Sequence, residues 1–94
     1  GRLPLAVDGV AWPLPMRTDF GNAIYLSVMN LSLDDWHTMT LAVNDRGARR
    51  RAAVLRPGGA WHPHGDVESE ADGALTLRFR EMVQPLDMIT VRLD

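Results

Sequence analysis

The stretch Ala23–Asn44, AIYLSVMNLSLDDWHTMTLAVN, decides the fold class of this chain. Both of its halves alternate apolar and polar residues, a period of two that is typical of β-strands with one face on a core. The apolar positions are Ile24, Leu26, Val28, Met39, Leu41 and Val43. The run Asn30–Trp36 between the halves is rich in Asn, Ser and Asp, which favour turns. The stretch therefore predicts two antiparallel strands that leave and return as neighbours.

Length and composition indicate one domain that spans residues 1–94. A chain of this size buries only roughly 60 to 65% of its unfolded surface and cannot be divided between two cores. Because it opens on Gly1 without a methionine, we expect it to be a piece excised from a larger protein. The absence of cysteine excludes disulfides and thiolate metal sites and leaves the cellular compartment open.

Charge and hydropathy narrow the classes of partner. The net charge is -2 and the basic cluster Arg49–Arg51 is outweighed by acidic residues elsewhere, so we expect no nucleic-acid binding. The apolar runs are far shorter than the ~20 residues that cross a bilayer, so we expect no membrane insertion. The pattern Asn30-Leu31-Ser32 fits a glycosylation sequon, which matters only in a secretory eukaryotic setting.

Turn signals about every ten residues divide the rest of the chain into further short strands. Alternation is strict in Ala74–Arg80 and Asp87–Leu93. Prolines in Leu3–Val7 and Val10–Met16 predict extended edge segments there, because proline cannot donate to a ladder on both sides. Ala48–Leu55 has good helix formers, yet it is too short to present an apolar stripe and is predicted to be a strand. The turns and loops are expected at 17–22, 45–47, 61–73 and 81–85, with a short extended piece near Val67.

These elements predict an all-β fold, an antiparallel β-sandwich of about seven short strands that is Ig-like or similar. We expect no helix longer than about two turns. The core is expected to consist of the inward residues Ile24, Leu26, Val28, Met39, Leu41, Val43, Val54, Leu75, Leu77, Phe79, Ile89, Val91 and Leu93.

One candidate metal site lies in the predicted loop that starts at Trp61. His62 and His64 fall on one side of an extended segment, and Glu68 could supply a third ligand, a spacing similar to that of cupin metal sites. The similarity ends there, because no histidine follows to supply a fourth ligand. We therefore expect an exposed histidine pair without a cofactor, and a small cupin-like metal-binding protein is the alternative.

A second candidate is an aromatic platform for carbohydrate. Trp36 and Trp61 lie at predicted loop ends, where exposed rings can stack on a sugar, and Asp34, Asp35 and His62 could orient its hydroxyls. Tryptophan at such a position also serves to close the open end of a sandwich, which is the alternative role. The further aromatic residues that could join the platform are Trp12 and Tyr25.

No set of residues predicts catalysis. The carboxylate pairs Asp34–Asp35 and Glu68/Glu70 lie in polar loops, whereas glycoside hydrolysis needs two acids held across a cleft with one pKa raised by burial. The sequence contains no recognisable Ser-His-Asp arrangement, phosphate-binding glycine loop or calcium loop. We expect that this chain is not itself an enzyme.

Three segments resemble the C-terminal all-β accessory domains of bacterial glycoside hydrolases, including β-galactosidase-like and arabinofuranosidase-like enzymes. They are the strand Ile24–Asn30 followed by Ser32, Asp34 and Asp35, the turn Leu55–Trp61, and the closing strand Pro85–Leu93. The resemblance covers about three quarters of the chain. It implies a non-catalytic domain of carbohydrate metabolism that packs against the catalytic domain of its parent chain. Such a role predicts an apolar patch that is exposed on the isolated domain.

Overall fold

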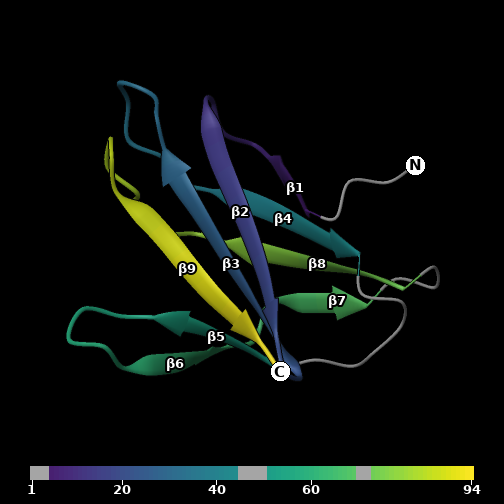
Figure 1. The fold of residues 1–94 in the computed structure, drawn as a ribbon. Helices are drawn as coiled ribbons and strands as arrows, with labels where there is room; N and C mark the ends of the chain where they lie inside the picture. Colours follow the sequence, from purple (N-terminus) through teal and green to yellow (C-terminus); the bar gives the residue numbers. More distant parts are fainter. Residues whose placement is uncertain (1–4, 45–50, 70–72) are drawn as a thin grey trace.

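The computed structural model describes residues 5–44, 51–69 and 73–94, and in this part of the chain every regular element is a strand. The nine strands are β1 (Leu5–Asp8), β2 (Pro13–Phe20), β3 (Ala23–Asn30), β4 (Met39–Asn44), β5 (Ala52–Leu55), β6 (Trp61–His64), β7 (Val67–Ser69), β8 (Ala74–Phe79) and β9 (Met88–Leu93). They form a four-stranded sheet, β1-β4-β8-β7, and a five-stranded sheet, β2-β3-β9-β5-β6. The five-stranded sheet lies in front in Figure 1. The predicted antiparallel β-sandwich is confirmed.

The inner faces of the two sheets share one core. The cross-strand register aligns buried residues within each sheet, for example Leu26 with Val91 and Leu41 with Leu77. Every residue that the sequence analysis placed in the core is buried, so the assignment of faces is confirmed. Burial of apolar surface at about 25 cal/mol per Å² is what holds the sheets together. The core also contains residues that alternation did not include, namely Leu5, Trp36, Ala52 and Val83.

The predicted pairing of the two central strands is wrong. β3 pairs with β2 and β9, whereas β4 pairs with β1 and β8 in the opposite sheet. The connection at residues 31–38 therefore crosses from one sheet to the other (Figure 1). Alternation shows which face of a strand is buried, and that pattern is the same for neighbours in one sheet and for strands that face each other across a core.

Two other segments are more extended than predicted. The turn expected at 17–22 is confined to Gly21 and Asn22, and β2 continues to Phe20, which lies opposite Ala23. Gly21 has a φ of 60°, which costs little without a Cβ. Residues 61–64, expected in a loop, form β6 opposite β5. β6 and β7 account for nine strands in the described residues where about seven were expected.

Part of the sequence interpretation falls outside the described residues. The predicted turn at 45–47, the basic residues Arg49 and Arg50, and Glu70 belong to this part. The described portion of the segment predicted at 48–55 is β5, an extended strand, as expected. Within the described residues no helix is long and apolar enough to span a bilayer.

Prolines protect the free edges of the five-stranded sheet. Pro13 and Pro15 lie on the outermost strand β2, as the sequence predicted for this segment, and Pro63 lies on the other outermost strand β6. β2 pairs with β3 over its whole length, so the missing N–H groups of its two prolines belong on the free edge. These edges are therefore poor templates for the addition of another strand.

We expect Leu41→Asp to unfold the domain, because Leu41 is fully buried and an unpaired charge in the core costs several kcal/mol against a total stability of ~5 to 15 kcal/mol. Circular dichroism and amide chemical-shift dispersion measure the outcome. Thr40→Asp is the matched control, since Thr40 is the adjacent half-buried residue of β4 on the opposite face. A folded Leu41→Asp protein would contradict the assignment of faces.

Candidate functional site

Three connections meet at the end of the sandwich opposite the C-terminus (Figure 1), and the buried side chain of Asn30 joins two of them. The connections are residues 9–12, 31–38 and 80–87. The Asn30 amide group donates to the backbone carbonyls of Asp34 and Val83, both at 2.8 Å. Its side-chain oxygen accepts from the Ser32 N–H and hydroxyl at 2.8 and 2.6 Å. All the polar groups of this buried side chain are therefore satisfied within the loops.

Backbone hydrogen bonds complete the network. The Asn30 N–H donates to the backbone carbonyl of Asp87 at 2.9 Å, and the Leu86 N–H donates to the backbone carbonyl of Asn30 at 2.7 Å. The Leu31 N–H donates to the Trp12 carbonyl at 3.1 Å, which ties in the first connection. The side-chain amide of Asn30 in the sequon is fully buried, and the folded domain therefore leaves no room for a glycan on it.

Trp36 closes this end of the sandwich from the inside. Its side chain is 5% exposed, its backbone pairs with Val83 as an isolated antiparallel bridge, and its indole N–H donates to the Ala11 carbonyl at 3.1 Å. A ring buried in this way offers no face to a sugar. The structure therefore assigns Trp36 the closing role that was the alternative to the predicted binding role.

Trp61 lies on a different surface, the outer face of the five-stranded sheet. Its ring centroid lies 6.2 Å from that of Tyr25, and the Arg92 guanidinium lies 4.7 Å from the ring centroid. Trp36 lies inside the core and Trp61 outside it, so the two rings form no common platform. The other predicted ligand-binding residues are exposed, Asp34 and Asp35 in the connection 31–38 and His62 on β6.

The candidate metal ligands His64 and Glu68 contact different groups of the protein. The His64 ring stacks on Phe79 of the opposite sheet at 4.2 Å, and its Nε2 contacts the Arg78 carbonyl at 2.7 Å. Glu68 instead accepts from the Arg78 guanidinium at 3.0 Å, and this hydrogen bond raises the pKa of Arg78. Among the described residues, no three His, Cys, Asp or Glu side chains converge on a point that could hold a metal ion.

The most distinctive surface is apolar. On the outer face of the five-stranded sheet, cross-strand pairs bring large apolar side chains side by side, for example Leu14 with Met29 and Met29 with Met88. We call this surface the outer apolar face; its exposed members are Leu14, Met16, Phe20, Leu55 and Met88. The corresponding face of the four-stranded sheet carries small or polar residues, namely Ala6, Asp8, Thr40, Ala42, Thr76, Arg78 and Glu68.

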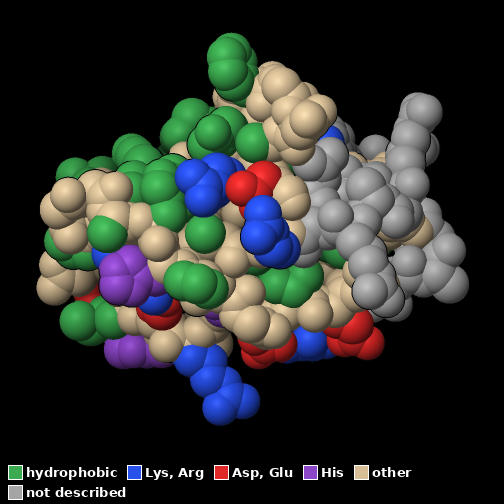
Figure 2. All heavy atoms as spheres, turned by 90° about the horizontal axis from the view of Figure 1, so that it is seen from below, with side chains coloured by type: hydrophobic (Ala, Val, Ile, Leu, Met, Phe, Trp, Pro, Cys, Tyr) green, Lys and Arg blue, Asp and Glu red, His purple; other side chains and the backbone are tan. Residues whose placement is uncertain are grey.

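The same contrast is visible in the space-filling view from the C-terminal end. Hydrophobic side chains gather in the upper part of Figure 2, the side of the five-stranded sheet, whereas acidic and basic side chains lie along the lower edge and in one group near the centre. Contiguous exposed apolar surface of this kind marks interaction sites in folded proteins.

The loop end adjoins the outer apolar face and is also apolar. We call it the apolar apex; its exposed members are Trp12, Leu31, Leu33, Met82 and Leu86. Leu33 is 95% exposed and Trp12 is 75% exposed. Trp12 and Leu86 have positive φ angles of 55° and 68°, conformations that cost non-glycine residues on the order of 1–3 kcal/mol each. Such backbone strain has no signal in the sequence, because neither residue type favours this region.

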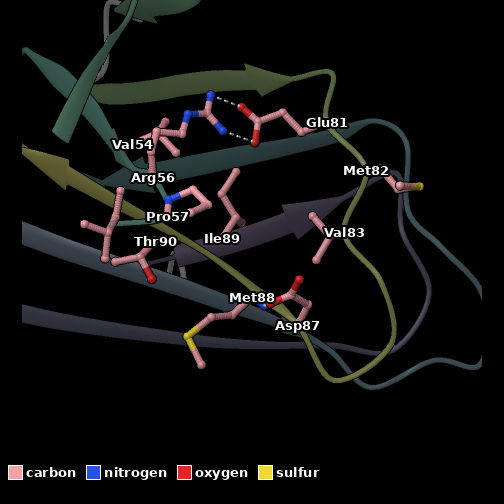
Figure 3. A pocket seen from close by; sticks show the side chains of 11 residues that line it. Val54, Arg56, Pro57, Glu81, Met82, Val83, Asp87, Met88, Ile89 and Thr90 are labelled. Carbon is pink, nitrogen blue, oxygen red and sulfur yellow. Dashed lines mark hydrogen bonds and ion pairs between the residues drawn. The ribbon is translucent and has the colours of Figure 1, made fainter. Parts of the chain in front are cut away.

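A hollow lies between the outer apolar face and the apolar apex (Figure 3). Its volume is about 440 Å³. The ladder of β9 with β5 ends at the pair Val54–Val91, whereas β9 stays paired with β3 down to Met88, so β5 and β9 separate above the hollow. The residues around it include Val54, Leu55, Arg56, Pro57, Glu81, Met82, Val83, Met88, Ile89 and Thr90.

One charged pair borders the hollow. The two terminal nitrogens of Arg56 donate to the two carboxylate oxygens of Glu81 at 2.6 and 2.8 Å, a bidentate arrangement drawn in Figure 3. These hydrogen bonds raise the pKa of Arg56. The pair connects the β5–β6 turn to the β8–β9 connection. This pair has no signal in the sequence, because nothing there indicates that two residues 25 positions apart meet.

Comparison with family models, with curated proteins and with solved structures found no match to this chain. The site is therefore interpreted from its own geometry.

We expect Asn30→Ala to destabilise the domain by about 2 to 3 kcal/mol, because it leaves buried loop groups without partners. Urea unfolding measures the change. The matched control is Gln84→Ala, which removes an exposed amide from one of the same connections and should cost less than about 0.5 kcal/mol. Equal losses in the two variants would show that the Asn30 network does not hold the loops.

Proposed function

We propose that this chain is a non-catalytic accessory module that packs through its outer apolar face against a catalytic domain of the same parent chain. The observation that carries the proposal is the distribution of exposed apolar side chains. In the described residues, every large exposed hydrophobic side chain lies either on the outer apolar face or at the apolar apex. The resemblance to accessory domains of glycoside hydrolases supports a carbohydrate-active parent enzyme.

The edges of the sheet favour docking by a face. Association through an edge would need free N–H donors, and Pro13, Pro15 and Pro63 remove donors from both outermost strands. Inter-domain interfaces within one chain typically bury roughly 600–1,500 Å², an area that one face of a small sheet can provide. The small and charged face of the opposite sheet then remains in water.

Two alternatives have weaker support. A carbohydrate-binding module would have to rely on Trp61, since Trp36 is buried, and Arg92 already covers Trp61 at 4.7 Å. A metal-binding role would need ligands that converge, and no group of three does so among the described residues.

We expect the double substitution Met16→Lys/Met88→Lys to weaken docking, because it places two charges on the outer apolar face where both side chains are about half exposed. In the intact parent protein the melting temperature of the catalytic domain should fall by several degrees, with kcat unchanged, as measured by calorimetry and a glycoside assay. The isolated chain should lose binding of the dye anilinonaphthalene sulfonate.

Thr76→Lys is the control, since it adds a charge to the outer face of the four-stranded sheet. It should leave both the melting temperature and the dye binding unchanged. Turnover of any glycoside by the chain alone, or equal effects of the variant and the control, would refute the proposal.

A further inference from the structure

A smaller recess lies on the outer face of the five-stranded sheet, beside the Trp61 ring. Its volume is about 210 Å³. We call it the Arg92 recess; the residues around it include Arg51, Ala53, Trp61, Pro63, Arg92 and Asp94. β9 lies between β3 and β5 in this sheet (Figure 1), and the register places Ala53 between Arg92 on β9 and Pro63 on β6. The recess therefore forms where the short side chain of Ala53 separates larger side chains on the neighbouring strands.

The guanidinium of Arg92 is held against an aromatic ring. Its central carbon lies 4.7 Å from the Trp61 ring centroid, and Arg92 pairs with Tyr25 across β9 and β3. The Tyr25 and Trp61 ring centroids are 6.2 Å apart. A guanidinium that stacks on a ring keeps its N–H donors at its edge, where they can bind an oxyanion. The stack therefore fixes this group without using its hydrogen-bond donors.

The Arg92 guanidinium makes no hydrogen bond to any residue that the structure describes. In contrast, the guanidinium groups of Arg17, Arg56 and Arg78 each donate to a carboxylate at 2.6 to 3.1 Å. The Nε of Arg92 is buried and without a hydrogen-bond partner, and the Asp94 carboxylate lies 3.5 Å away. The Arg92 side chain is only 30% exposed, so water compensates it incompletely. Unused donors on a fixed, half-buried guanidinium favour an incoming acceptor.

The charges around the recess favour a single negative charge. Arg51 and Arg92 contribute two positive charges, while Asp94 contributes one negative charge at 3.9 and 3.5 Å from their Nε atoms. One positive charge therefore remains, which a carboxylate would neutralise and a phosphate dianion would exceed. The apolar surfaces of Ala53 and Trp61 suit the methylene groups that precede a carboxylate. An acidic side chain combines these two features.

The position of the recess connects it to docking. Leu55, a member of the outer apolar face, lies opposite Trp61 in the ladder of β5 with β6. A domain that docks on the outer apolar face would therefore also cover the recess. If it brought no acceptor, docking would remove water from the charge of Arg92 and leave that charge unpaired, which is unfavourable.

We propose that the Arg92 recess is a carboxylate-binding site that receives one Asp or Glu side chain of the docked domain. The inference rests on the proposed docking function and adds a specific charged contact to it. The terminal nitrogens of Arg92 bind the carboxylate, and Arg51 adds a second positive charge at the recess.

The test uses propionate, which carries a carboxylate on a short apolar chain as an acidic side chain does. It is titrated into the chain at constant ionic strength while amide and indole N–H chemical shifts are recorded. We expect saturable shifts at Ala53 and at the Trp61 indole, with a dissociation constant on the order of tens of millimolar because the site is open to water. Propionamide has a similar shape without the charge and should bind at least about tenfold more weakly.

Variants test which groups bind propionate. Arg92→Lys keeps the charge but loses the planar fork, and it should weaken propionate binding by about threefold or more. Arg51→Gln changes a side chain that is 90% exposed, so the fold is retained, and it should weaken binding by about threefold. Arg80→Gln is the matched control, since Arg80 is also exposed but follows β8 in the opposite sheet. It should change propionate affinity by less than about 1.5-fold.

The source of the carboxylate is tested by modification of arginine with phenylglyoxal, measured by mass spectrometry. Arg92 should react in the chain alone, more slowly with propionate present, and should be protected in the intact parent protein. Arg80 should react in both proteins.

Four results would overturn the inference. They are the absence of saturable shifts up to about 0.5 M propionate, equal binding of propionamide, equal effects of Arg51→Gln and Arg80→Gln, and equal reaction of Arg92 in the chain and in the parent protein. The first three leave the docking proposal to its own test, since Met16→Lys/Met88→Lys reports on the apolar side chains of the face.

Discussion

The arrangement of the loop end depends on one buried side-chain amide. Asn30 ends β3 and is fully buried, so its amide must find partners inside the protein, and the partners it has belong to two different connections. A buried polar group without partners costs about 1–3 kcal/mol, which makes other arrangements of these loops unfavourable. The bridge between Trp36 and Val83 and the indole hydrogen bond to Ala11 add the remaining links. The position of the apolar apex follows from this network.

The network also explains how strained residues persist. Trp12 and Leu86 have positive φ angles, and each is held by a backbone hydrogen bond to the segment that contains Asn30. Strain of this kind survives only where the surroundings fix it, and it is found most often at functional sites. The strained backbone thus holds the large apolar side chains of Trp12 and Leu86 in solvent, and their exposure to water is itself unfavourable. Docking onto another apolar surface would recover that energy.

The sequence predicts the core far better than the connectivity. Every residue that alternation placed inward, from Ile24 to Leu93, is buried, because each strand has one face against the core, whichever strand lies beside it. It could not identify the sheet to which β4 belongs, since a crossing connection and a hairpin contain similar turn residues. The hydrogen-bond network at the loop end could not be predicted, because it joins residues that are far apart in the sequence. By sequence, Asn30 is typical of a turn, and Trp36 at a predicted loop end suits either sugar stacking or closure of the sandwich; only their hydrogen-bond partners distinguish these roles.

The outer faces of the two sheets differ in the side chains that they expose. A sandwich whose two outer faces both meet water would be expected to carry polar residues on both, as alternation implies. Here the outer face of β4 and β8 meets this expectation with Thr40, Thr76 and Arg78, while β2 and β9 place Leu14, Met16 and Met88 outward. Alternation of buried and exposed positions is preserved in both sheets, so the fold does not require the apolar side chains of the outer apolar face. Docking of the kind proposed above would explain their presence, and the prolines on both outermost strands of this sheet favour approach to its face over addition to its edge.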